Sequence, residues 1–166
     1  MSPKAVIIGP PGSGKTTIGE LLAARLGVAF RDTDHDVEAT AGKPIGEIFV
    51  DDGEEHFREL ERAAVRDALA THDGVIALGG GAVLDPETQA DLADHRVVYL
   101  QVGLSDAVKR VGLASARPLL VLNPRSQFRK LMEERRPIYE RLAALTVETD
   151  DRQPADVADE IVKGLS

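Results

Sequence analysis

The 166-residue sequence predicts an α/β protein with three layers, α/β/α, built on a five-stranded parallel sheet. Two observations lead to this fold class. Short apolar runs alternate along the chain with longer segments of helical pattern, and the apolar runs are nearly continuous instead of alternating with polar residues. Strands that are apolar on both sides are typical of a parallel sheet that helices cover on both faces.

The predicted strands are short, partly β-branched and bounded by turn residues; they cover residues 5–8, 28–30, 75–78, 97–100 and 145–147. Between them we expect helices over residues 16–26, 54–70, 86–93, 105–111, 126–142 and 154–165. Pro86 and Pro154 stand where a first helical turn tolerates proline, and Asp85 suits an N-cap.

Two stretches do not follow this alternation. Residues 35–53 hold short helical fragments interrupted by Gly42, Pro44 and Gly53, and residues 112–125 hold two prolines, two arginines and no clear period. Loops of this size in a compact domain are usually lids or substrate-binding insertions, the alternative being a variable surface loop. We therefore expect one domain over residues 1–166, with a substrate-binding insertion at about 33–61 and a lid at about 112–125.

Composition narrows the function. The net charge of −8 argues against a general binder of nucleic acid or of anionic membranes, although it leaves room for a local cationic pocket. The chain has no cysteine, which excludes disulfides, thiolate metal sites and cysteine nucleophiles. The apolar run at the N-terminus is too short for a signal peptide, and no stretch reaches membrane-spanning length, so a cytoplasmic protein is expected.

The stretch "GPPGSGKT" at residues 9–16 matches the phosphate-binding pattern G-x-x-x-x-G-K-[ST], and we call it the P-loop. It follows a predicted strand and opens a predicted helix, as phosphate binding requires. Lys15 is expected to reach the β- and γ-phosphates of ATP, and the Thr16 hydroxyl to bind Mg²⁺. No Asn-Lys-x-Asp loop of a switch GTPase is present, so the P-loop indicates a small kinase for a metabolite or a nucleotide.

A pair of carboxylates follows the second predicted strand, in "FRDTD" at residues 30–34. If this stretch is extended, Asp32 and Asp34 point the same way, so that one could hold the magnesium shell while the other faces the acceptor. Turn-forming aspartates are the alternative interpretation.

These motifs make the chain resemble the shikimate kinases over nearly its whole length. The resemblance rests on "GPPGSGKTT", "DTD" at 32–34, "FRELE" at 57–61, "LGGGAV" at 78–83, "RPLL" at 117–120 and "RRPIYERLA" at 135–143, in the family's order and spacing. It implies a P-loop kinase that transfers the γ-phosphoryl group of MgATP to the 3-hydroxyl of shikimate. That reaction belongs to the chorismate pathway of aromatic amino-acid biosynthesis, and family members are commonly monomeric.

The resemblance also implies roles for residues. Asp34 is expected to be the catalytic base, and Asp32 to hold Mg²⁺ through water beside Thr16. Arg58 and Arg135 are expected to clamp the substrate carboxylate, where a planar bidentate donor suits a planar anion. The remaining expected substrate-binding residues are Gly79, Gly80 and Gly81, which would offer backbone N–H groups where a Cβ would intrude. The expected ATP-binding residues are Gly12, Ser13, Gly14, Lys15, Thr16, Thr17, Arg110, Arg117 and Arg152, with Arg117 as the catalytic arginine of the lid.

Three alternatives stay open on the residues alone. A gluconate kinase also recognises a carboxylate with hydroxyls, whereas the three glycines and the Asp32/Asp34 pair weigh against a nucleoside-monophosphate kinase. A non-catalytic ATP-binding relative would be expected to have lost Lys15, Asp34 or Arg117, and all three are present.

Overall fold

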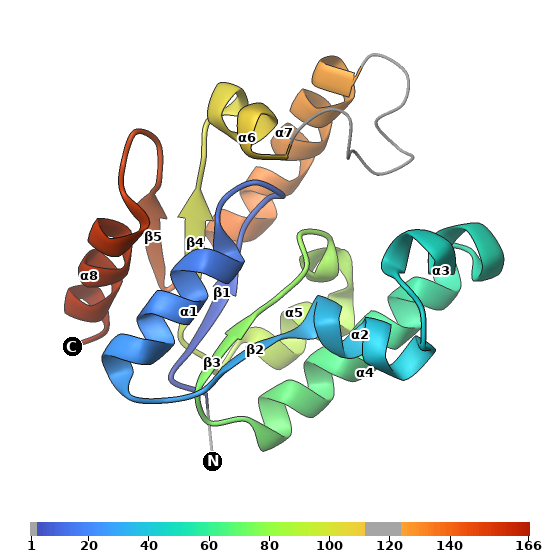
Figure 1. Cartoon of the computed structure of the whole chain (residues 1–166), viewed down its shortest axis with the longest axis horizontal. Helices are drawn as coiled ribbons and strands as arrows, with labels where there is room; N and C mark the ends of the chain where they lie inside the picture. The colour runs from blue at the N-terminus through green and yellow to red at the C-terminus, as the bar shows by residue number, and fades with distance from the viewer. Residues whose placement is uncertain (1–2, 112–123) are drawn as a thin grey trace.

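The computed structural model describes residues 3–111 and 124–166, with only the backbone of residues 110, 111, 124 and 125. Five parallel strands form one sheet in the order β2-β3-β1-β4-β5, with helices on both faces (Figure 1). The strands are β1 (Ala5–Ile8), β2 (Phe30–Asp32), β3 (Val75–Ala77), β4 (Val97–Gln101) and β5 (Leu145–Glu148). The predicted fold class is confirmed.

Both faces of the inner strands β1, β3 and β4 are buried, which explains why these strands are apolar almost throughout, whereas the edge strands β2 and β5 are only partly buried and carry polar residues. Ala5 and Ile7 of β1 belong to a core shared with α1 (Lys15–Leu26) and α8 (Pro154–Leu165). Val6 and Ile8 belong to the opposite core, shared with α4 (Glu54–Thr71), α5 (Pro86–Leu92) and α7 (Pro124–Leu142). A polar residue at either set of positions would lose hydration without gaining a partner.

The second strand begins two residues later than predicted, at Phe30 instead of residue 28. The reason lies at the end of α1, where Gly27 has a φ of 68° and the N–H of Val28 donates to the carbonyl of Ala23 at 3.0 Å. This Schellman-type cap uses Val28 to close the helix, so that it is not available to the strand.

Residues 35–53 contain helical segments interrupted at Gly42, Pro44 and Gly53, as the sequence predicts, and these segments are two regular helices. They are α2 (Thr33–Ala41) and α3 (Ile45–Asp52), and Gly42, with a φ of 73°, ends the first of them. Val37, Ile48 and Phe57 form a separate small core between these helices and α4. Figure 1 shows α2, α3 and the start of α4 gathered to one side of the sheet. The insertion is therefore a packed helical unit.

A further small core lies between α6 (Leu104–Val111) and α7, which pack together through Ala107, Phe128 and Met132. The 3-10 helix η1 (Ala82–Leu84) follows β3 and leads into α5, whose N-cap is Asp85, as predicted. None of the helices in residues 3–111 and 124–166 is long and apolar enough to cross a membrane.

The strand order decides where a ligand can bind. The chain passes from the central β1 to the outer β2, returns through β3 and then crosses to β4. In open α/β sheets, ligands bind beyond the carboxyl ends of the strands where the strand order reverses. The P-loop follows β1, the three glycines follow β3, and Asp32 ends β2, so three predicted motifs meet at this edge.

Candidate active site

The P-loop has the backbone conformation that a phosphate cradle requires. Gly12 and Gly14 have φ values of 84° and 89°, in the left-handed region that favours glycine, and Gly14 is the N-cap of α1. The loop thus delivers the N-terminus of α1, where N–H groups without intrahelical partners attract anions. The Nζ of Lys15 donates to the carbonyls of Gly9 at 2.9 Å and Pro10 at 3.0 Å, which holds its ammonium group over the loop.

Asp32 links the end of β2 to both the P-loop helix and α2. Its Oδ2 accepts a hydrogen bond from the Thr16 hydroxyl at 3.2 Å, and its Oδ1 accepts one from the N–H of Asp34 at 2.9 Å. Asp32 is therefore the N-cap of α2. A hydroxyl and a carboxylate side by side next to a phosphate cradle are oxygen ligands of the kind that Mg²⁺ accepts together with phosphates and water.

The expectation that Asp32 and Asp34 point the same way along an extended strand is wrong. Asp32 ends the strand, whereas Asp34 lies in the first turn of α2, because the cap formed by Asp32 starts a helix at Thr33. Both carboxylates nevertheless line the same cavity.

This cavity has a volume of about 440 Å³ and joins the P-loop to the ends of β2 and β3. It is lined by Pro11, Gly12, Gly14, Lys15, Thr16, Thr17, Asp32, Asp34, Ala77, Leu78 and Gly80. A second cavity of about 240 Å³ shares Gly14 and Thr17 with the first and extends to Thr149, Arg152 and Pro154. The two cavities adjoin at the start of α1, and together they offer space on both sides of the P-loop.

The three predicted arginines of the nucleotide end are described to different extents. Arg152 lines the second cavity, where it donates to the carbonyl of Glu148 at 3.0 Å and pairs with Glu160 at 2.8 Å. Arg110 lies on α6, with its backbone alone described. Arg117 and the predicted lid fall outside the described residues, apart from the start of α7.

The three glycines at residues 79–81, which we call the glycine segment, make room for side chains of the site. None of them has a positive φ, so backbone strain does not require glycine there. A Cβ on Gly79 would stand 2.5 Å from Oδ1 of Asp34, and one on Gly81 would stand 2.6 Å from Nη2 of Arg58. One on Gly80 would stand 3.0 Å from Cδ of Pro11 and 3.3 Å from Nη1 of Arg135. Each glycine therefore faces a different predicted substrate-binding side chain.

Arg58 is held from its own helix. Its Nη1 donates to Oε1 of Glu61 at 2.7 Å, and its guanidinium lies 5.2 Å from the centroid of the Phe57 ring. Glu61 is buried, with 3% of its surface exposed, while Arg58 keeps 20% of its side chain exposed. Nη2 of the same guanidinium lies 3.8 Å from Oε1 of the exposed Glu54, a longer contact that an anionic ligand would have to replace. Arg135 is also buried, at 7% exposure, on α7.

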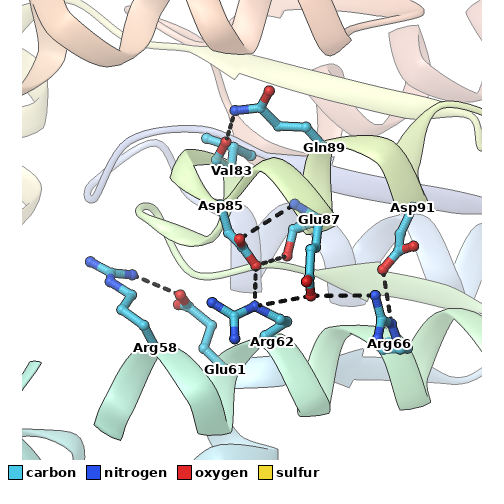
Figure 2. Close-up of polar contacts among 10 residues, drawn as sticks. Arg58, Glu61, Arg62, Arg66, Val83, Asp85, Glu87, Gln89 and Asp91 are labelled. Atoms are coloured by element: carbon cyan, nitrogen blue, oxygen red, sulfur yellow. Dashed lines mark hydrogen bonds and ion pairs between the residues drawn. The ribbon is translucent and has the colours of Figure 1, made fainter. Parts of the chain in front are cut away.

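Polar contacts beside Arg58 bind α4 to the segment that follows the glycines (Figure 2). The Nε of Arg62 donates to Oδ2 of Asp85 at 2.5 Å, and Arg66 pairs with Asp91 at 3.2 Å. Burial would raise the pKa of Asp85, but the hydrogen bonds from Arg62 and from the N–H of Glu87 outweigh it and hold that pKa below its ordinary value. These contacts fix the helix that carries Arg58 against the end of the glycine segment.

Sequence reasoning gave no role to two of the residues that order this site. They are Arg62, with its bond to Asp85, and Tyr139, whose hydroxyl donates to the carbonyl of Gly80. The signal for Tyr139 was present, because it lies four residues after Arg135 on a predicted helix and such residues share one face. No local pattern indicated the role of Arg62, since its partner Asp85 lies 23 residues away in the sequence.

Comparisons with known proteins identify the family to which the chain is similar. The family model described as shikimate kinase matches residues 11–166. A shikimate kinase of Salinispora arenicola (strain CNS-205) is 60% identical over 166 residues, which span 100% of this chain and 99% of the relative. A solved structure of shikimate kinase from Acinetobacter baumannii in complex with shikimate has a TM-score of 0.93 at 35% identity, covering 98% of this chain and 92% of that one. A gluconokinase from Sinorhizobium meliloti 1021, at 18% identity and a TM-score of 0.57 over 99% of this chain and 91% of that one, shares the fold alone.

Proposed function

The chain belongs to the shikimate kinase family, and we propose that it uses this site to transfer the γ-phosphoryl group of MgATP to the 3-hydroxyl of shikimate. As a member of that family it is an ATP-dependent phosphotransferase with an alcohol acceptor. The observation that carries the site assignment is the cavity of about 440 Å³ in which the P-loop, both aspartates and Gly80 meet. Shikimate 3-phosphate and ADP are the products.

At the nucleotide end, residues 12–17, from the P-loop and the first turn of α1, hold the phosphates through backbone N–H groups and the charge of Lys15. In the structure the Lys15 ammonium bonds two loop carbonyls, and phosphate oxygens would take the place of those acceptors. The cavity beside Arg152 is the place for the adenosine part, because it continues from the phosphate cradle through Gly14 and Thr17. Arg110 and Arg117 remain predicted contacts to ATP.

Thr16 and Asp32 are the residues that would hold Mg²⁺, Thr16 directly and Asp32 through water. Their oxygens lie 3.2 Å apart beside the P-loop, and no group of three or more acidic or histidine side chains that could hold a metal is found among the residues described. This donor set suits an ion that keeps waters and shares phosphate oxygens. When bound, the ion neutralises charge on the β- and γ-phosphates.

At the acceptor end, Arg58 and Arg135 bind the shikimate carboxylate, and the N–H groups of the glycine segment bind ring oxygens. Asp34 accepts the proton of the 3-hydroxyl as that oxygen forms its bond to the γ-phosphorus and the bond from phosphorus to the ADP oxygen breaks. Asp34 lies against Gly79 and lines the same cavity as the P-loop. The expected lid at about 112–125, the monomeric state and the cytoplasmic location stay predictions.

The test is ADP release from MgATP with shikimate, gluconate, each nucleoside monophosphate or no acceptor. Strong stimulation by shikimate alone supports the proposal. Stimulation by gluconate or by a nucleotide instead would point to another small kinase on this fold. ATP binding without stimulation by any acceptor would leave only a nucleotide-binding protein.

A further inference from the structure

A buried tyrosine of α7 reaches the middle of the glycine segment. The hydroxyl of Tyr139 donates to the carbonyl oxygen of Gly80 at 2.5 Å, and Tyr139 is 1% exposed. Its ring is stacked on that of Tyr99 of β4, with centroids 5.0 Å apart and planes at 23°. The hydroxyl is therefore aimed by packing, and it cannot turn away without disturbing the core.

The carbonyls on either side are held differently. The carbonyl of Gly79 accepts from the N–H of Ala82, and that of Gly81 accepts from the N–H of Leu84, both at 3.1 Å. These are local bonds of the turn that leads into η1. The carbonyl of Gly80 is instead held by a side chain 59 residues away in the sequence. With its carbonyls committed to protein donors, the segment offers a ligand its N–H groups.

The orientation of one peptide group follows from this bond. A trans, planar peptide points its C=O and N–H in opposite directions, so fixing the carbonyl of Gly80 also fixes the N–H of Gly81. Glycines on both sides of that peptide would allow it to rotate at little steric cost. The Tyr139 hydroxyl selects one orientation.

We propose that Tyr139 is a positioning residue for the acceptor: it sets the Gly80–Gly81 peptide against which the substrate binds. Arg135 lies one turn earlier on the same helix, with Nη1 3.3 Å from where a Cβ of Gly80 would stand. One face of α7 thus carries both Arg135, which would bind the substrate carboxylate, and Tyr139, which orients the N–H of Gly81. This inference rests on the proposed function.

Tyr139→Phe tests the inference, because it removes the hydroxyl and keeps the stacked ring. We expect the KM and the calorimetric Kd for shikimate to rise roughly tenfold, as a buried carbonyl loses its donor. The KM for ATP should stay within about twofold of the wild-type value, since the P-loop is untouched. KM does not depend on how much enzyme is folded, so the measurement survives a loss of stability.

Tyr99→Phe is the matched control. Tyr99 is the other half of the stack, is 3% exposed, and has Arg136 close enough to its hydroxyl to affect its pKa. It should lower the melting temperature and leave the KM for shikimate within about twofold. A wild-type KM in Tyr139→Phe, or an equal rise in both variants, would overturn the inference alone. A wild-type enzyme that shikimate does not stimulate would overturn the proposed function, and the inference with it.

Discussion

Replacing Gly81 with alanine tests whether the glycine segment exists to make room for Arg58. An alanine Cβ would stand 2.6 Å and 2.7 Å from the two Nη atoms, so the guanidinium must retreat by roughly 0.8 Å to reach the 3.4 Å at which ordinary contact begins. The backbone itself accepts alanine, since Gly81 has a φ of −97° and a ψ of −1°. The substitution should therefore act by displacing the Arg58 guanidinium and not by straining the backbone.

The expected rise in the KM for shikimate follows from the hydrogen bond between Arg58 and the shikimate carboxylate, which the displaced guanidinium would lose. A hydrogen bond to a charged group is worth about 1.5–3 kcal/mol, so its loss should raise the KM for shikimate roughly 10- to 100-fold. The KM for ATP should not change. Both values come from ADP release measured across a range of each substrate.

Gly46→Ala is the control for Gly81→Ala. Gly46 is exposed on α3, and a Cβ there would meet no atom within 4 Å, so wild-type kinetics are expected. If Gly81→Ala binds shikimate as tightly as the wild type, the reasoning about the glycine segment is refuted.

Three other changes have defined outcomes. Asp34→Asn should lower kcat by about 10²- to 10⁴-fold with a smaller effect on KM, because it removes the proton acceptor; full turnover would contradict the assigned base. Arg135→Lys should raise the KM for shikimate about tenfold, since an ammonium cannot form a bidentate pair with a carboxylate, and a KM equal to that of the wild type would count against the clamp. Because the pKa of Asp85 is lowered in the folded protein, its charged form stabilises the fold at pH values above the ordinary pKa of about 3.9. This stabilisation is lost as the pH falls through the pKa that Asp85 has in the folded protein. The free energy of unfolding, measured with urea between about pH 6 and pH 2.5, should therefore fall less at the acid end for Asp85→Asn than for the wild type. If this free energy depends on pH in the same way in both proteins, the bond to Arg62 has no such role.

The sheet could be predicted because its evidence is local. The inner strands β1, β3 and β4 are runs of apolar residues because both of their faces are buried, and the P-loop conformation depends on Gly12 and Gly14. The start of β2 was misplaced because the capping bond from Val28 to Ala23 competes with the strand. The stretch from Asp32 to Asp34 was interpreted as extended, although an aspartate before a helix is also an N-cap signal.

The reason for the glycine segment could not be derived from the sequence. Three glycines indicate a close approach, and we expected the approaching group to be the ligand. In the structure the side chains of Asp34 and Arg58 occupy the space that Cβ atoms on Gly79 and Gly81 would need, and Pro11 and Arg135 pack closely against Gly80. The side chains of Asp34, Arg135 and Arg58 come from α2, α7 and α4, and only the packing of those helices brings them to one turn.

The central claim is that these three side chains face the acceptor, and a crystal structure of the enzyme with shikimate and ADP tests it most directly. We predict the carboxylate of shikimate between Arg58 and Arg135, and its 3-hydroxyl within hydrogen-bond distance of Asp34. A shikimate molecule bound with its carboxylate away from both arginines would contradict the account.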